Sequence, residues 1–394
     1  MRQAWRWFGP EAGVPLDAVR QAGATDVVSA LHEVPIGRAW TESEVAAHKA
    51  MIETAPAGRS PLVWSVVESI PVPDAVKREG ATAKSEIDAW IASLEAVAAN
   101  NIRVICFNFM PVVDWTRTDL DYELPTGATA MRFDQDRFAA FDLHVLQRKG
   151  AEAEYSPEDR ARAKAVFDAM SEKDVADITT NIASALPGST TEPLTIPAFR
   201  ERLERYRGID AGKLRRHLIE FLVAIAPAAE ARGVRLALHP DDPPRSLFGL
   251  PRVASTGDDY AALFDAVPSP SVGMCLCTGS LGVRADNDLP AIARCFAERI
   301  FFAHLRATKR EGDGRSFHES AHLEGDLDMV AVLRELLAED RKRSAEESII
   351  FRPDHGHRML DDLEKKVNPG YPAIGRLRGL AELRGIIHAL EAGI

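Results

Sequence analysis

The sequence predicts an α/β protein of the (β/α)8 TIM-barrel class, formed as one domain over residues 1–394. Eight short, nearly continuous apolar runs recur along the chain, and helical patterns lie between most of them. Four of the runs also end on a residue that can bind a metal. Near-continuous apolarity is typical of parallel strands covered on both faces, and eight such strands alternating with helices favour a closed barrel over an open sheet.

The expected strands share a β-branched, apolar composition bounded by turn or cap residues. They are residues 2–8, 26–31, 62–68, 102–109, 234–239, 272–277, 300–305 and 348–354. Helical periodicity follows at residues 41–55, 74–99, 211–233, 289–299 and 327–340. Thr41 and Glu44 have the spacing of a capping box, which predicts that the first of these helices begins there.

One interval departs from this alternation. Residues 110–210 separate the fourth expected strand from the next long helix and contain helical stretches of their own, one of which starts at Ser156-Pro157. We expect this segment to be a mostly helical insertion after the fourth strand, on the face where the βα loops gather. Its charged, low-aromatic content indicates a cap over the barrel mouth or an oligomer contact.

The composition excludes several classes of function. The chain has 46% hydrophobic residues and a net charge of −11, which argues against a nucleic-acid-binding surface. No apolar run reaches the roughly 18 residues that a membrane span needs, and the N-terminal stretch lacks the apolar core of a signal peptide. Four cysteines are too few for a disulfide scaffold in a chain of this length, so we expect a cytoplasmic protein with reduced thiols.

The last four expected strands each finish on a residue that can hold a metal: His239, Cys277, His304 and Asp354. The C-terminal ends of barrel strands meet on one face, so these side chains can converge although they are far apart in sequence. Each alone is ordinary, since a buried histidine or cysteine is usually structural. Together they predict a divalent-metal site, and the thiolate by itself would favour zinc or iron.

Other polar residues follow the same strands. His355, next to Asp354, is suited to proton transfer near neutral pH. Arg306 lies two residues past His304 and so shares its side, where it can bind a carboxylate, and Arg352 is a second candidate for that role.

Polar residues also follow the strands of the first half. We expect His32 and Asn108, with Glu68 and Trp115 nearby, to line the same cavity and bind sugar hydroxyls.

Several motifs resemble the mannonate dehydratase family over residues 5–390. They include "WSVVESIPV", "LHPDDPP", "CTGSLG", "RPDHGH" and "NPGYP". The resemblance implies a xylose-isomerase-like barrel that removes water from D-mannonate to give 2-keto-3-deoxy-D-gluconate, a hydro-lyase of hexuronate catabolism. It also implies that His239, Cys277, His304 and Asp354 hold Mn²⁺ or Fe²⁺, and that His355 and Tyr371 act at the reacting atoms.

The reaction requires removal of the proton at C2 and loss of the hydroxyl at C3. His355 and Tyr371 would divide these two proton transfers, and we favour Tyr371 as the base and His355 as the acid, although the sequence does not decide between them. An alternative is a metal-dependent sugar or sugar-acid isomerase or epimerase on the same barrel. A further alternative is a non-catalytic barrel that binds a sugar acid. The only partners we expect are the small sugar-acid substrate and further copies of the chain in a homo-oligomer.

Overall fold

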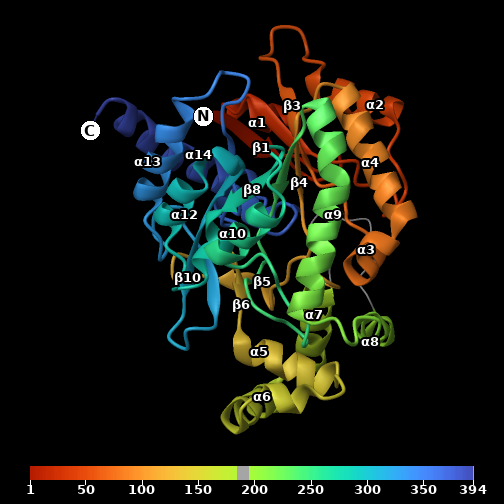
Figure 1. Cartoon of the computed structure of the whole chain (residues 1–394). Coiled ribbons are helices and arrows are strands. Elements are labelled where there is room, and N and C mark those ends of the chain that lie inside the picture. Colours follow the sequence, from red (N-terminus) through yellow and green to blue (C-terminus); the bar gives the residue numbers. More distant parts are fainter. Residues whose placement is uncertain (184–194, 394) are drawn as a thin grey trace.

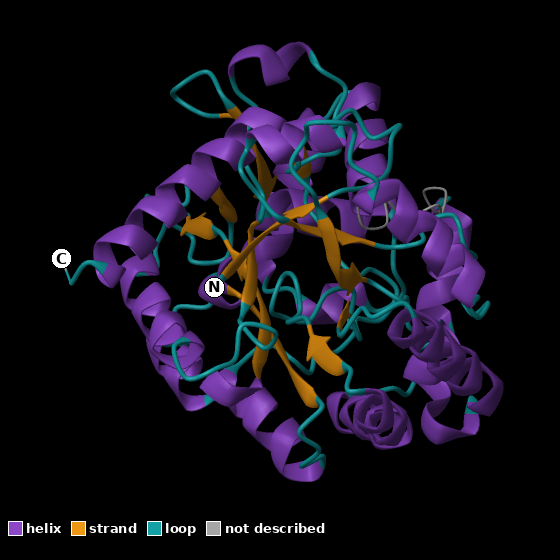
Figure 2. Ribbon diagram, turned by 90° about the horizontal axis from the view of Figure 1, so that it is seen from above, coloured by secondary structure: helices purple, strands orange, loops and turns teal. Residues whose placement is uncertain are grey.

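The computed structural model describes residues 1–183 and 195–393. Eight parallel strands close into a barrel in the order β1-β12-β9-β8-β7-β4-β3-β2, and a ring of helices surrounds them (Figure 2). The barrel strands are β1 (Arg2–Arg6), β2 (Asp26–Ser29), β3 (Val63–Glu68), β4 (Val104–Phe107), β7 (Arg235–Leu238), β8 (Val272–Cys277), β9 (Ile300–Leu305) and β12 (Ile350–Pro353). Each lies inside one of the eight expected runs, which confirms the predicted barrel.

Two of the helices around the barrel have a boundary at an expected signal. Thr41 and Glu44 form the predicted capping box, and α9 ends at Gly233, whose φ of 61° suits the left-handed region. The helices around the barrel are α1 (Leu16–Gln21), α2 (Glu42–Glu53), α3 (Asp74–Glu79), α4 (Lys84–Ala99), α9 (Ala211–Arg232), α10 (Gly257–Ala266), α11 (Thr278–Gly282), α12 (Leu289–Cys295), α13 (Met329–Asp340) and α14 (Ala373–Glu391). Short 3-10 turns lie at η1 (Gly80–Thr82), η4 (Ala297–Arg299) and η5 (Leu360–Glu364).

The pattern over residues 74–99 forms two helices, α3 and α4, where the periodicity indicated one. The break falls at Gly80, which has a φ of 58° and lies against α9. A Cβ at this position would be 2.0 Å from Glu220 Oε2, so only glycine fits the close approach. Tertiary packing against α9 therefore decides where the helix is interrupted.

The barrel interior is filled by small and branched side chains. They include Ala4, Val28, Val66, Val104 and Ala237, all at most 1% exposed. The larger core lies between the barrel and its helices. This inner layer closes the barrel below the strand ends, and active sites of such barrels form at the C-terminal mouth.

A second, antiparallel sheet lies at the mouth end of the barrel, in the order β10-β11-β6-β5 (Figure 1). Its strands are β5 (Asp119–Glu123), β6 (Thr129–Phe133), β10 (Ala307–Arg310) and β11 (Phe317–Ser320). Two strands thus come from the insertion and two from the loop after β9. The expectation of a mostly helical insertion missed this sheet because its strands are short and polar, although Gly127, with a φ of 79°, marks the turn between β5 and β6.

The described helices of the insertion extend away from the sheet (Figure 1). They are α5 (Gln135–Ala140), the π-helical turn η2 (Phe141–Val145), η3 (Ala151–Glu154), α6 (Pro157–Ala169), α7 (Glu172–Ala183) and α8 (Ile196–Glu204). Ser156 caps α6 as expected. Phe133, Phe138, Phe141 and Phe199 of the insertion form an aromatic cluster with Phe248 from the loop after β7, so the interpretation of the segment as low in aromatics was wrong. Residues 184–194, inside the predicted insertion, lie outside the described residues.

None of the helices in residues 1–183 and 195–393 is long and apolar enough to cross a bilayer.

Candidate active site

Strand register aligns the polar residues at the barrel mouth. Cys277 on β8 pairs with His304 on β9, and His304 pairs in turn with Arg352 on β12. Paired residues of neighbouring strands point to the same side, so all three side chains face the barrel axis at one level. His239 directly follows β7 and Asp354 directly follows β12, so both extend from the same end.

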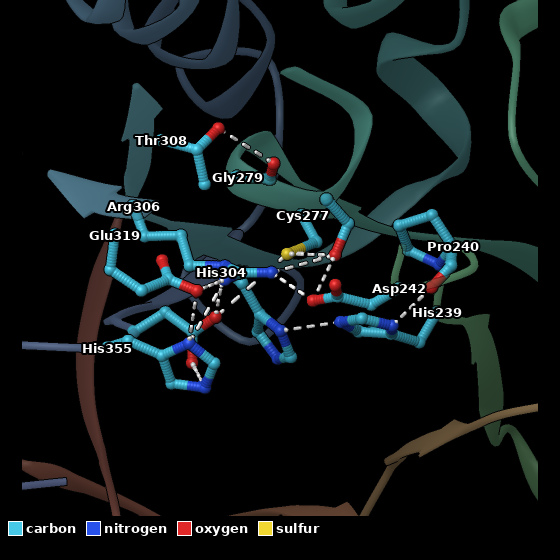
Figure 3. Close-up of polar contacts among 12 residues, drawn as sticks. His239, Pro240, Asp242, Cys277, Gly279, His304, Arg306, Thr308, Glu319 and His355 are labelled. Atoms are coloured by element: carbon cyan, nitrogen blue, oxygen red, sulfur yellow. Dashed lines mark hydrogen bonds and ion pairs between the residues drawn. The ribbon is translucent and has the colours of Figure 1, made fainter. Parts of the chain in front are cut away.

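Three of the four predicted metal donors lie together. The donor atoms of His239, Cys277 and His304 are all within 4.8 Å of one another, and His239 Nε2 is 3.1 Å from His304 Nδ1 (Figure 3). Asp354 Oδ2 is 3.9 Å from the Cys277 sulfur, but the carboxylate also forms ion pairs with Arg306 and Arg352. Two imidazoles, a thiolate and an adjacent carboxylate fit a divalent cation.

The electrostatics of the cluster favour an ionised sulfur. Burial alone would raise the pKa of the Cys277 thiol, but Arg306 and His239 outweigh it and hold that pKa well below its usual range. For the His239 imidazole, burial alone would lower the pKa, but the nearby Cys277 sulfur raises it to about 10. A thiolate is the form of cysteine that binds a metal, so the site supplies its donor already ionised.

A second group of donors lies deeper in the barrel. Cys106, Cys275 and His304 also have donor atoms within 4.8 Å of one another. Cys106 and Cys275 belong to the apolar layer that fills the barrel interior. A substrate cannot reach a cation in that layer, so the donors at the mouth are the ones suited to chemistry.

A cavity opens at the barrel mouth. It is lined by Arg6, Phe8, Glu68, Ser69, Asn108, Met110, Asp114, Trp115, His239, Asp242, His304, Arg306, Arg352, Asp354, His355 and Tyr371. The rings of His355 and Tyr371 meet edge to face, with centroids 5.2 Å apart, and Trp115 approaches His355 at 5.9 Å. The two predicted proton-transfer groups therefore border the same cavity as three of the metal donors, His239, His304 and Asp354, whereas Cys277 is not among the described residues that line it.

The two arginines expected to bind a substrate carboxylate contact the protein's own carboxylates. Arg352 pairs with Glu68 and Asp354. Arg306 pairs with Asp354 and with two further carboxylates whose role the sequence did not reveal, those of Asp242 and Glu319. Spacing along a strand showed which way the arginines point but not which acids lie across the barrel from them.

The remaining predicted residues divide into two groups. Asn108, Glu68 and Trp115 line the cavity as expected. His32 is not among the described residues that line it. Its ring lies against the cavity-lining Phe8, with centroids 5.5 Å apart. Sequence analysis also overlooked Arg6, a buried cation of β1 that borders the cavity and could have been identified from its place within the first predicted strand.

A closed parallel barrel with thiolate, imidazole and carboxylate donors at its C-terminal mouth defines a barrel enzyme with a site suited to a metal ion. A family model described as D-mannonate dehydratase (UxuA) matches residues 1–394, and the chain belongs to this family of hydro-lyases. A relative from Brucella canis named "Mannonate dehydratase" is 74% identical over 392 residues, covering 100% of this chain and 98% of the relative.

Solved structures agree with this assignment. The mannonate dehydratase from Streptococcus suis serotype2 superposes with a TM-score of 0.77 at 29% identity, over 100% of this chain and 96% of that one. A xylose isomerase domain protein from Planctomyces limnophilus superposes with a TM-score of 0.50 at 12% identity, over 100% and 98% of the two chains. The second likeness concerns the fold alone and confirms a xylose-isomerase-like barrel.

The comparisons do not favour the isomerase or epimerase alternative. Several carboxylates line the cavity, so their number does not by itself separate a dehydratase from an isomerase. Glu68, Asp114, Asp242 and Asp354 all line the cavity. The family match therefore carries the distinction.

Proposed function

We propose that this chain catalyses the dehydration of D-mannonate to 2-keto-3-deoxy-D-gluconate. The observation that carries the proposal is a cavity bordered by the metal donors His239, His304 and Asp354 and by His355 and Tyr371. The chain that holds this cavity matches the D-mannonate dehydratase family over its whole length.

We propose His239, Cys277, His304 and Asp354 as the ligands of a divalent cation, Mn²⁺ or Fe²⁺. Such a cation supplies Lewis-acid stabilisation of negative charge on the substrate carboxylate and hydroxyl oxygens. The choice of ion follows the family resemblance, whereas the thiolate and imidazole donors favour softer ions than Mn²⁺. Removing the metal and restoring activity with Mn²⁺, Fe²⁺, Co²⁺ or Zn²⁺ in turn tests the preference.

The protein's own residues then account for two proton transfers. We assign Tyr371 to removal of the C2 proton and His355 to protonation of the departing C3 hydroxyl, which leaves as water. Burial raises the pKa of the Tyr371 phenol, and Arg352, whose guanidinium lies 5.7 Å from the ring centre, acts in the opposite direction. Arg352 therefore lowers the cost of the phenolate that a Tyr371 base requires.

Substrate binding is proposed for further residues that line the cavity. Asn108 is suited to a sugar hydroxyl, and Arg6, which is buried and pairs with Glu68, adds positive charge for the substrate carboxylate. Arg306 and Arg352 border the cavity with their donors already engaged, so we propose that they attract the carboxylate through charge and hold Asp354 in place. We no longer propose direct substrate contact for His32.

The test is an assay of the purified protein with Mn²⁺ against D-mannonate and its epimeric aldonates. We expect a keto-deoxy acid from D-mannonate, detected by NMR of the product. An isomeric sugar acid in its place would favour the isomerase alternative and contradict the proposal.

His355→Asn provides the sharper test of the assigned chemistry. A positioned acid contributes about 10²–10⁴ in rate, so kcat should fall by that factor while the metal content and thermal unfolding stay as in the wild type. A metal-loaded variant within threefold of the wild type would show that His355 does not transfer the proton.

We also propose a cytoplasmic homo-oligomer that takes part in hexuronate catabolism. All four cysteines are free, which suits a reducing compartment. Leu360 and Leu363 on η5 and Leu377 on α14 are exposed apolar residues of the kind that subunit contacts cover. Light scattering after size-exclusion chromatography should give a mass above one chain.

A further inference from the structure

Four charged side chains form a closed ring beside the candidate active site. Arg117 donates to Asp242 at 2.7 Å and to Glu319 at 2.8 Å. Arg306 donates to the same two carboxylates (Figure 3). Each side chain is at most 2% exposed, so two arginines and two carboxylates balance their charge in an environment that excludes water.

The ring joins two separate parts of the fold. Asp242 follows β7 and Arg306 follows β9, so both belong to the barrel. Glu319 lies on β11, where strand pairing places it opposite Thr308 of β10, and Arg117 precedes β5 in the insertion. The second sheet therefore places the Glu319 carboxylate beside Arg306, at a position that is not the end of a barrel strand.

That carboxylate reaches the proposed acid. Glu319 Oε1 is 3.2 Å from His355 Nδ1, on the side of the ring away from the metal donors, while His355 Nε2 lies 3.7 Å from Asp354 Oδ1. Arg306 Nη1 lies 3.0 Å from His355 Nδ1 and also donates to Glu319 Oε1. Glu319 Oε1 is therefore within hydrogen-bonding distance of both nitrogens. Trp115 and Tyr371 then limit ring motion from their edge-to-face positions.

We propose that Glu319 is a positioning residue for His355. Its carboxylate accepts a hydrogen bond from the Nδ1–H group and so fixes the ring with Nε2 directed at the reacting atoms, as carboxylates orient catalytic imidazoles in general. The inference rests on the proposed dehydratase function, because it requires His355 to transfer a proton. It gives the second sheet a part in the chemistry in addition to covering the mouth.

Glu319→Gln removes the charge and keeps the length of the side chain. We expect kcat to fall about 10–100-fold while KM and bound cation per chain stay within about twofold of the wild type. Glu311→Gln is the matched control, because Glu311 pairs with Arg132 beside the same sheet and is not among the described residues that line the cavity. The control should retain wild-type kcat.

A double-variant cycle separates positioning from a purely structural role. If Glu319 acts through His355, Glu319→Gln should cause no further loss of kcat in the His355→Asn background. A structural role predicts that the two losses multiply, and that result would overturn the proposal. Should Glu319→Gln fail to fold, Glu319→Asp keeps the ring charge but withdraws the carboxylate from Nδ1, and the same cycle applies to it.

The wild-type assay keeps this inference distinct from the proposed function. If the wild type forms no keto-deoxy acid from D-mannonate, the proposed function fails. If the wild type does form it and Glu319→Gln retains the kcat of Glu311→Gln, only the positioning role fails.

Discussion

The eight-stranded barrel and the sheet β10-β11-β6-β5 bury charged residues around one cavity, but they hold them in different ways. In the barrel, register places Cys277 and His304 level with each other at strand ends. In the sheet region, Glu319 and the neighbouring Arg117 instead form buried ion pairs with the barrel residues Asp242 and Arg306. Strand ends of a barrel thus present reactive groups to the mouth, whereas the added sheet fixes the orientation of those groups from outside.

The largest effect should come from the barrel donors. Cys277→Ala should lose the bound cation and lower kcat at least about 10³-fold, since the cation supplies several kcal/mol of charge stabilisation. Cys275→Ala is the matched control, because Cys275 is equally buried on β8, two residues earlier. Metal analysis of both variants decides between the mouth and the deeper donor group. If Cys275→Ala loses the cation while Cys277→Ala keeps it, the metal lies in the deeper group of Cys106, Cys275 and His304.

The second effect concerns the ring that the sheet completes. Arg117→Met leaves Asp242 and Glu319 buried with Arg306 as their shared partner, so the free energy of unfolding should fall by about 3–5 kcal/mol. Urea denaturation followed by circular dichroism measures the loss. A change below about 1 kcal/mol would mean that the ring does not connect the sheet to the barrel.

A smaller effect should appear on the barrel side as a dependence of stability on pH. His48 of α2 lies within hydrogen-bonding distance of Ser29, with Nε2 2.9 Å from Oγ, and its ring contacts Trp64. Burial lowers its pKa from 6.5 to about 4. The unfolded chain binds the proton more readily, so this stabilisation is complete above pH 6.5 and is lost as the pH falls towards 4.

Because the His48 ring is only half-buried, we expect the free energy of unfolding to fall by about 1–2 kcal/mol over this pH range. His48→Gln should remove it, so that the difference in unfolding free energy between the variant and the wild type changes across this pH range. Parallel pH curves for the two proteins would contradict the assignment.

The smallest effect should come from a partly exposed ion pair of the sheet. Arg132 and Glu311 pair at 2.6 Å, with about a fifth of each side chain exposed. Arg132→Ala should cost about 0–1 kcal/mol of unfolding free energy and leave kcat unchanged. If Arg132→Ala lowered the free energy of unfolding as much as Arg117→Met, solvent exposure would not explain the difference between this ion pair and the buried pairs of Arg117.

The sequence alone determined the barrel and five of the polar residues at its mouth. Near-continuous apolar strands can be buried only in a sheet covered on both faces, and residues that end parallel strands must meet on one side. That reasoning located His239, Cys277, His304, Asp354 and His355. Only the tertiary structure shows which carboxylates form ion pairs with Arg306 and Arg352. It also shows that Glu319 lies within hydrogen-bonding distance of His355. These contacts join side chains that packing brings together, in the case of Glu319 and His355 from different sheets, and no local periodicity encodes them.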